Sequence, residues 1–454
     1  MEHLDEEERQ YAWNEVEDSL SEGKIDQFRA EFLELHPYDQ AKVFEELEEE
    51  LRQVIYTYVS PKEMADVMEH VEHEESEPYF SEMDPRFASE VFAEMSSDDA
   101  VDILNQLEKD KVASFLTIMN KEDAQEIKDL LHYEEKTAGS IMTTEYVSLK
   151  ASMKVREAME HLRTEAPDAE TIYYTYVVDD DKKLAGVISL RDLIISEPDW
   201  TIEEAMSDRV VSVSVAKDQE EIAQMMRDYD FLALPVVDFQ DHLLGIITVD
   251  DIMDVMDEEA SDDYSKLAGI SDVDGPNDNA FTSAKKRLPW LIILLFLGSL
   301  TASLISQFEA QLNQVAILAI FIPLIAGMAG NTGTQALAVA IRGIATGEIR
   351  KQGKMRMMLR EASTGLITGV VCGVIITLVV YVWQGNFFLG LLVGISVMSA
   401  LIVATIAGAF VPLIMDRLNI DPAVASGPFI TTINDLISIL IYFGMASAFM
   451  NLLV

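Results

Sequence analysis

The chain has 454 residues, enough for two or three domains. Its charge is uneven, because residues 1–275 hold 72 acidic and 23 basic side chains whereas residues 276–454 hold 7 and 10. The acidic front excludes nucleic acid as a partner and favours cations. The single cysteine, Cys372, excludes a disulfide framework and a cysteine zinc cluster. The N-terminal residues MEHLDEEERQ lack the basic and apolar regions of a signal peptide, so we expect the front to stay in the cytosol.

Residues 1–135 are expected to form an all-α, superhelical, acidic domain. Four similar helix starts recur there, and each opens on an N-cap residue followed by acids in the first turns, as helix starts prefer. These starts are at Ser60, Asp84, Ser97 and Asn120. The recurrence predicts an array of short amphipathic helices.

Two similar α/β units follow, over residues 136–200 and 201–257. Each is predicted as strand, turn, a second strand ending in Gly-apolar-apolar-Ser/Thr, and a helix opened by Asp. The pattern, spacing and duplication resemble a tandem pair of CBS domains, which implies a cleft for an adenine nucleotide such as ATP. The resemblance implies these nucleotide contacts: Asp192 for ribose, Arg191 for phosphate, and Tyr174 and Phe231 for the base. A structural pair that binds no nucleotide is the alternative.

Carboxylates gather in the stretch 250–263, which leads into a connecting segment predicted over 258–280. Like charges four residues apart destabilise a helix, so a counterion is expected. Oxygen-rich sites of this kind suit Mg²⁺, which keeps several waters and needs one or two carboxylates per site. The candidate ligands on this reasoning are Asp98, Asp102, Glu220, Asp230, Asp250, Asp251, Asp254, Glu259, Asp262 and Asp263. A solvated acidic surface is the alternative.

Residues 281–454 contain five apolar stretches, each long enough to cross a bilayer. They are expected at about 288–306, 314–340, 362–383, 387–415 and 424–450. Basic residues lie before the first stretch, after the second and after the fourth, and the other connections have none. The positive-inside rule therefore predicts a multi-pass plasma-membrane protein with a cytoplasmic N-terminus and an external C-terminus.

An ionisable side chain within a span is costly and usually faces a water-filled path. Asp435 in the fifth span is therefore predicted to line an ion path, with Thr431 and Asn434 beside it. In the second span, Pro323 and a run of small residues around Asn331 and Gln335 indicate either a broken helix that lines the path or close helix packing. A structural role for Asp435 is the alternative. One carboxylate per chain holds a divalent ion weakly, so a homodimer is expected.

Three motifs in this order resemble the MgtE family of magnesium channels over essentially the whole chain. They are residues 133–143, residues 330–335, and residues 421–428 leading to Asn434 and Asp435. The resemblance implies a helical domain, a CBS pair, a connecting "plug" helix and five spans in a homodimer. It also implies that the pore carboxylate is Asp435, that Asp66 joins the regulatory ligands named above, and that the plug helix carries Glu259, Asp262 and Asp263.

The resulting hypothesis is a Mg²⁺-selective channel or transporter that admits Mg²⁺ down its electrochemical gradient and closes when Mg²⁺ binds the acidic cytosolic domains, with modulation by ATP. The sequence contains no phosphate-binding loop or nucleophile constellation, so catalysis is not expected. The alternatives are a transporter that prefers Mn²⁺ or Co²⁺, and a membrane-tethered nucleotide or metal sensor without a pore.

Overall fold

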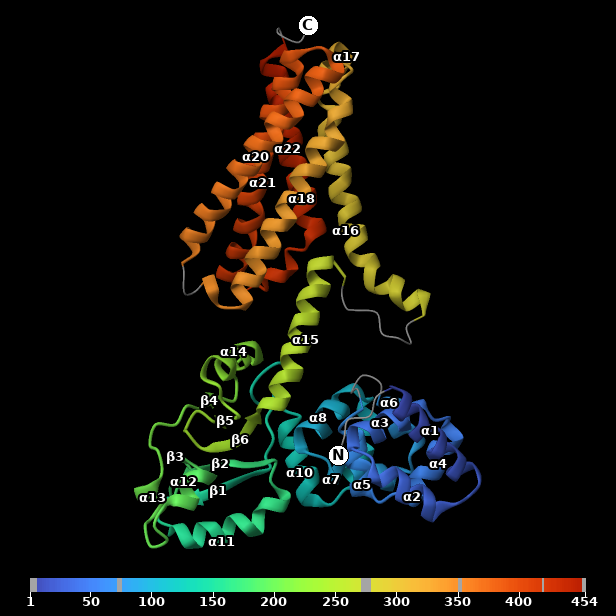
Figure 1. Ribbon diagram of the computed structural model, residues 1–454, viewed down its shortest axis with the longest axis vertical. Coiled ribbons are helices and arrows are strands. Elements are labelled where there is room, and N and C mark those ends of the chain that lie inside the picture. Colours follow the sequence, from blue (N-terminus) through green and yellow to red (C-terminus); the bar gives the residue numbers. More distant parts are fainter. Residues whose placement is uncertain (1–5, 72–75, 271–278, 350–352, 419, 451–454) are drawn as a thin grey trace. The chain divides into compact units, whose positions relative to one another are not determined.

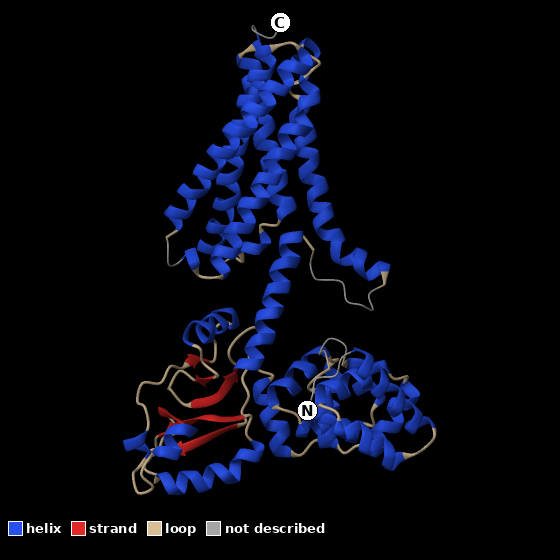
Figure 2. Ribbon diagram, viewed as in Figure 1, coloured by secondary structure: helices blue, strands red, loops and turns tan. Residues whose placement is uncertain are grey.

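The computed structural model describes residues 6–71, 76–270, 279–349, 353–418 and 420–450. The chain divides into two compact units, Met1–Met256 and Asp257–Val454. The first contains short helices followed by two small sheets, and the second is built from helices (Figures 1 and 2). This order agrees with the predicted fold class of a helical domain, an α/β pair and an all-α membrane domain.

Short amphipathic helices form the first part of the first unit. They are α1 (Glu6–Ser21), α2 (Ile25–Glu34), α3 (Pro37–Glu46), α4 (Glu49–Tyr58), α5 (Pro61–Met68), α6 (Glu77–Glu82), α7 (Pro85–Glu94), α8 (Ser97–Gln106), α9 (Lys109–Ile118) and α10 (Lys121–Leu130). Ser60, Asp84 and Asn120 cap α5, α7 and α10 with their side chains, as predicted. The N-cap of α8 is Ser96, so the prediction of Ser97 was wrong by one residue.

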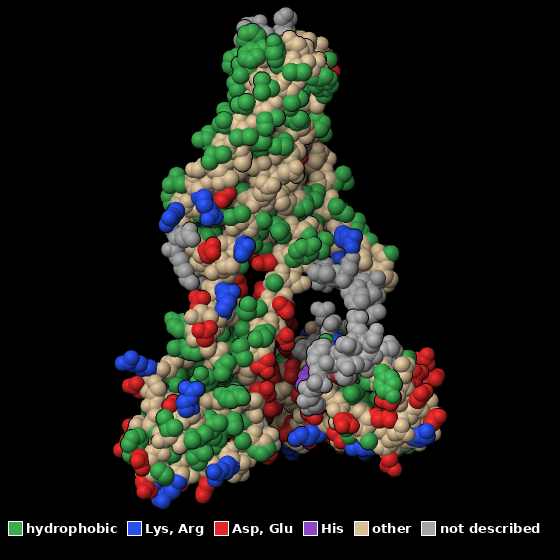
Figure 3. All heavy atoms as spheres, in the orientation of Figure 1, with side chains coloured by type: hydrophobic (Ala, Val, Ile, Leu, Met, Phe, Trp, Pro, Cys, Tyr) green, Lys and Arg blue, Asp and Glu red, His purple; other side chains and the backbone are tan. Residues whose placement is uncertain are grey.

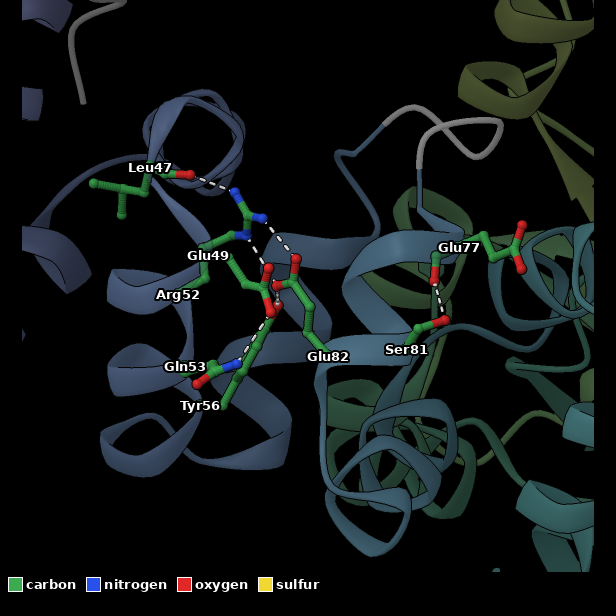
Figure 4. Close-up of polar contacts among 8 residues, drawn as sticks. All are labelled: Leu47, Glu49, Arg52, Gln53, Tyr56, Glu77, Ser81 and Glu82. Carbon is green, nitrogen blue, oxygen red and sulfur yellow. Dashed lines mark hydrogen bonds and ion pairs between the residues drawn. The ribbon is translucent and has the colours of Figure 1, made fainter. Parts of the chain in front are cut away.

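A network of polar contacts links α4 to α6 (Figure 4). The Arg52 guanidinium donates to both Glu82 carboxylate oxygens, at 3.0 and 2.6 Å, and to the Leu47 carbonyl. The Tyr56 hydroxyl donates to the same carboxylate at 3.0 Å, and the guanidinium lies 5.0 Å from the Tyr79 ring centroid. Burial and the Glu82 charge raise the pKa of Tyr56, so its hydroxyl stays protonated. The Arg52 and Glu82 side chains are only 13 % and 11 % exposed, so the charged pair is largely shielded from water.

The two α/β units have the same topology, as the sequence duplication predicted. Their elements are β1 (Tyr146–Lys150), α11 (Val155–Glu165), η2 (Ala166–Asp168), β2 (Thr171–Val178), β3 (Leu184–Ser189), α12 (Leu190–Ile195), α13 (Ile202–Ala205), β4 (Val213–Ser214), α14 (Gln219–Tyr229), β5 (Ala233–Val237) and β6 (Leu243–Thr248). In each sheet the first strand is parallel to the second, which is antiparallel to the third.

Steric crowding explains why the repeated motif has glycine at positions 186 and 245. A Cβ at Gly245 would lie 2.6 Å from the Thr143 carbonyl oxygen, and one at Gly186 would lie 2.8 Å from that of Ser207. Backbone segments cross the third strand of each sheet at these points and pair with it, Thr143 with Ile246 and Ser207 with Val187. Only a residue without a side chain allows this approach.

Helix α15 (Val249–Ala268) begins at the end of β6 and continues without interruption across the predicted boundary at residue 257. Its first half belongs to the first unit and its second half to the second. The predicted connecting segment 258–280 therefore starts inside a helix, and part of it, residues 271–278, lies outside the described residues.

Five helices of the second unit are long and apolar enough to cross a membrane, which confirms the predicted number among the described residues. They are α16 (Ala280–Ser306), α18 (Leu318–Ala345), α20 (Lys354–Gln384), α21 (Phe387–Arg417) and α22 (Gly427–Ala448), with α17 (Glu309–Gln314) and η3 (Pro422–Val424) between them. Hydrophobic side chains dominate the surface of these helices, whereas acidic side chains gather over the first unit and α15 (Figure 3).

Candidate functional site

Helices α18 and α22 approach each other closely where the second span carries its small residues. A Cβ at Gly333 would lie 1.8 Å from the Asn434 amide nitrogen, and one at Gly330 would lie 2.7 Å from the Thr431 methyl group. Helix α18 is unbroken through Pro323 and this glycine run. Of the two explanations that the sequence left open, the structure therefore supports close packing over a broken helix.

Two neighbouring residues of α22, Asn434 and Asp435, have side-chain polar atoms that lack a hydrogen-bonding partner in the described part of the chain. Asn434 is 1 % exposed, and both atoms of its amide lack a partner among the described residues. The half-buried Asp435 has one carboxylate oxygen that likewise lacks a hydrogen-bonding partner among the described residues. Polar groups buried without partners are costly, so their presence in a spanning helix indicates a ligand-binding role.

The other predicted pore residues divide into two groups. Thr431 faces α18, where its hydroxyl lies 3.2 Å from that of Thr334. Asn331 and Gln335 are on α18 and exposed. The hydroxyls of Thr432 and Ser438, on the same helix as Asp435, donate to backbone carbonyls of that helix, at 2.9 and 3.0 Å.

In the first unit, Asp98 of α8 and Asp251 of α15 lie near enough for the charge of one to act on the other. Asp98 is 8 % exposed, and one of its carboxylate oxygens has no hydrogen-bonding partner among the described residues. Burial and the charge of Asp251 raise the pKa of Asp98 well above its usual value. Burial raises the pKa of Asp251 to about 6, against the effect of hydrogen bonds from the Thr248 hydroxyl and amide. Two neighbouring carboxylates fit a hard divalent cation.

Sequence reasoning missed four carboxylates around this pair. They are Glu69, Asp99, Glu145 and Glu170. Burial, together with repulsion from the neighbouring carboxylates, raises the pKa of Glu69, Glu145 and Glu170 to about 7. Glu145 and Glu170 flank strands and stand apart from any acidic run, so only their partners in space reveal them.

The remaining predicted ligands of the first unit lie at varied positions. Asp66 is near enough to Glu69 for its charge to raise the pKa of that side chain. Asp102 is half-buried on α8, Glu220 and Asp230 are exposed at the two ends of α14, and Asp250 and Asp254 are exposed on α15. Asp230 is the C-cap of α14, in the left-handed region with φ of 55°. Within the ranges that the structure describes, no three Asp, Glu, His or Cys side chains could together hold a metal ion.

At the far end of α15, a lysine lies among the predicted ligands Glu259, Asp262 and Asp263. The Lys266 ammonium lies 2.7 Å from an Asp421 oxygen and 3.6 Å from an Asp262 oxygen. Burial and the charge of Asp421 raise the pKa of Asp263 to about 6, and Lys266 opposes that rise. All these groups belong to the second unit.

The predicted nucleotide contacts lie at the ends of the sheets. Tyr174 of β2 pairs in register with Ser189, whose hydroxyl caps α12 and donates to Asp192 at 2.7 Å. Arg191 and Asp192 are exposed, and Phe231 stacks on Tyr229 at the end of α14, 5.4 Å between centroids. The matching carboxylate of the second repeat is Asp251, which lies near Asp98 instead. The repeats thus place equivalent carboxylates in different surroundings.

The sequence matches three family descriptions. They are "Divalent cation transporter" (MgtE) over residues 322–445, "MgtE intracellular N domain" over 35–136, and "CBS domain" over 138–198 and 202–258. It is 53 % identical over 436 residues to a magnesium transporter MgtE of Enterococcus faecalis, with 96 % of each chain covered. The chain belongs to the MgtE family. An MgtE of Bacillus subtilis is 41 % identical, over 95 % of this chain and 96 % of that one.

Two solved structures resemble the part of this chain that precedes the five apolar helices. The soluble part of a magnesium transporter is 49 % identical, with a TM-score of 0.54, and covers 56 % of this chain and 100 % of that one. The cytosolic domain of the Mg²⁺ channel MgtE in complex with ATP is 40 % identical, with a TM-score of 0.51, over 54 % and 99 %. The resemblance to MgtE predicted from three motifs is thereby confirmed, and the five apolar helices make the chain a multi-pass membrane protein.

Proposed function

We propose that this MgtE is a Mg²⁺-selective channel that admits Mg²⁺ down its electrochemical gradient and is closed by Mg²⁺ on its acidic cytosolic carboxylates. The pair Asn434–Asp435 carries the proposal, because three of its side-chain polar atoms have no partner among the described residues of a spanning helix. Amide and carboxylate oxygens are the ligands that Mg²⁺ prefers, directly or through its water shell.

The membrane potential alone can drive Mg²⁺ into the cell. Two charges that cross a potential of ~100 mV gain about 4.6 kcal/mol, at about 2.3 kcal/mol per charge. The close approach of α18 to α22 positions Asn434, and Thr431, Asn331 and Gln335 supply further polar groups on the same two helices. A homodimer would bring two Asp435 carboxylates to one path, which suits a divalent cation better than one carboxylate.

Closure follows from the neighbouring carboxylates of the first unit. Without a cation, Asp98, Asp251 and their neighbours repel one another, so the contact between α8 and α15 is weakened. Mg²⁺ that bridges Asp98 and Asp251 favours the compact arrangement and shifts the equilibrium toward it. Helix α15 then carries the change to the second unit, because it is one continuous helix.

The CBS pair is proposed to bind ATP, as the related cytosolic domain was solved with ATP. Thr175 and Tyr176 fit a ligand there, because their hydroxyls are buried and have no hydrogen-bonding partner in the described part of the chain. Tyr174 would hold the base from one side and Phe231 from the other repeat, Asp192 would accept ribose hydroxyls, and Arg191 would pair with phosphate.

Orientation is proposed from the charge of the connections. Lys285, Lys286 and Arg287 precede the apolar stretch of the first span, and Arg356 and Arg360 lie at the start of α20. The N-terminal ends of the first and third spans are therefore assigned to the cytosol. The first unit is then cytoplasmic and the C-terminus external.

The test is Mg²⁺ flux into proteoliposomes at an inside-negative potential, with Mg²⁺ varied on the side of the soluble unit. We expect flux that disappears as this Mg²⁺ rises, and loss of flux in Asp435→Ala. Equal flux of Mn²⁺ or Co²⁺ under the same conditions would overturn the selectivity, since oxygen ligands also accept those ions. Absence of flux in wild type and Asp435→Ala alike would leave a tethered sensor as the function.

A further inference from the structure

The end of α15 is seated on the start of α22. A Cβ at Gly427, the first residue of α22, would lie 3.2 Å from the Leu267 carbonyl oxygen, and one at Gly269 would lie 3.4 Å from the Pro428 ring. The Leu267 side chain packs against a cluster that includes Ala423, Ala425 and Ile430. We call this contact, between Leu267 and Gly269 on one side and Gly427 and Pro428 on the other, the seat. It is a close contact between backbones with an apolar lining.

The seat lies on the helix that carries the proposed pore residues. Asp435 follows Gly427 by eight residues, which is about 12 Å along an α-helix at about 1.5 Å per residue. A movement of α15 against Gly427 is thus applied to the same rigid element that holds Asn434 and Asp435.

Charge at the seat is unfavourable without a cation. Asp262 and Asp263 approach it from α15 and Asp421 from the segment before α22, and the charge of Asp421 acts directly on Asp263. Lys266 supplies the cation, since its ammonium is within 4 Å of both Asp421 and Asp262. The ammonium is covalently part of α15, so it is present at every Mg²⁺ concentration.

We propose that Lys266 is a positioning residue of the gate, and that its ammonium, paired with Asp421, is a tethered cation that holds α15 on α22 and lowers the Mg²⁺ concentration at which the channel closes. This inference rests on the proposed function. Asp262 and Asp263, which the sequence alone presented as ligands for a diffusible ion, are here neutralised in part by the chain itself. Mg²⁺ then has to supply only the remaining stabilisation of the seated state.

The expected shift in the Mg²⁺ concentration for half-closure follows from the solvent exposure of the Lys266–Asp421 pair. The Lys266 and Asp421 side chains are 32 % and 41 % exposed, so the pair has the modest strength of a partly solvated ion pair. Lys266→Met should raise the Mg²⁺ concentration for half-closure by about two- to fivefold. Lys266→Arg keeps the charge and should stay near wild type, and the exchange Lys266→Asp with Asp421→Lys should recover most of the shift.

Lys354→Met is the matched control, because Lys354 pairs with Asp416 and joins α20 to α21. It removes an ammonium of the same unit and should leave the half-closure concentration unchanged. A shift of equal size in Lys354→Met would overturn the proposal, since loss of any lysine charge would then suffice.

Cross-linking provides a readout that does not depend on conduction. In a Cys372→Ala background, Leu267→Cys and Ala425→Cys report seating of α15 by the yield with a short bismaleimide, in the full-length protein in liposomes. The yield at low Mg²⁺ should fall when Lys266→Met is added and return in the charge exchange. An unchanged yield and half-closure concentration in Lys266→Met, with wild-type flux still closed by Mg²⁺, would refute the role of Lys266 and leave the channel function intact. Wild type without flux would instead refute the channel function.

Discussion

Gly333 offers the sharpest test of how α18 positions the proposed pore residue Asn434. In Gly333→Ala the new methyl carbon would lie 1.8 Å from the Asn434 amide nitrogen and 3.2 Å from an Ile430 methyl group. Non-bonded heavy atoms prefer separations of about 3.5 Å or more. The Asn434 side chain therefore has to rotate, or the two helices have to separate.

The cost is that of overpacking, about 1 to 3 kcal/mol of unfolding free energy. If the same free energy opposes the conducting arrangement, Mg²⁺ flux falls by about 5- to 150-fold. The assay is thermal unfolding in detergent together with flux into proteoliposomes. Asn434→Ala in the Gly333→Ala background removes the clashing amide and should restore stability without restoring flux.

Gly327→Ala is the matched control, because Gly327 is in the same helix and a Cβ there meets no atom within 4 Å. It should be neutral or slightly stabilising, since alanine favours a helix over glycine by about 1 kcal/mol. A Gly333→Ala protein with the stability and flux of Gly327→Ala would refute the close packing of α18 on Asn434.

Two further predictions concern the first unit. Arg52→Met should destabilise it by about 3 kcal/mol in denaturant unfolding, because the Glu82 carboxylate, only 11 % exposed, would lose its guanidinium partner and keep only the Tyr56 hydroxyl. Lys111→Met, from the more exposed pair with Glu77, should cost at most about 1 kcal/mol. The pKa values of Glu69, Glu145 and Glu170, raised to about 7, make the native state bind more protons than the unfolded state, so without Mg²⁺ stability should fall as the pH rises from about 4.5 to about 7. Glu145→Gln with Glu170→Gln should flatten that slope, and a slope of opposite sign would contradict the assigned burial.

Local signals in the sequence were sufficient for the order of domains and for most element positions. Ser60, Asp84 and Asn120 cap helices because capping depends on the side chain itself and the next three residues. Apolar length likewise predicted the five spans, since the bilayer sets the required number of residues. The one-residue error at Ser97 arose because Ser96 and Ser97 are equally suited to cap a helix.

Only some residues of the candidate site could be predicted from the sequence. Asp435 stood out because a carboxylate within a span is unusual at any position. Glu145 and Glu170 did not, because acids at strand ends are ordinary and their pKa values depend on residues far away in the chain. The same holds for Asp251, whose motif matches that of Asp192 although its surroundings differ.

The sequence by itself determined the membrane half, the duplicated α/β units, the acidic front and the relationship to MgtE, because each depends on composition, periodicity or motifs read along the chain. Tertiary structure alone decided that α18 is unbroken, that Gly333 lies on Asn434, that Asp98 lies near Asp251, and that Lys266 pairs with Asp421. These contacts join residues between 101 and 155 positions apart. No local pattern encodes such a distance, because folding brings the partners together through the packing of whole helices.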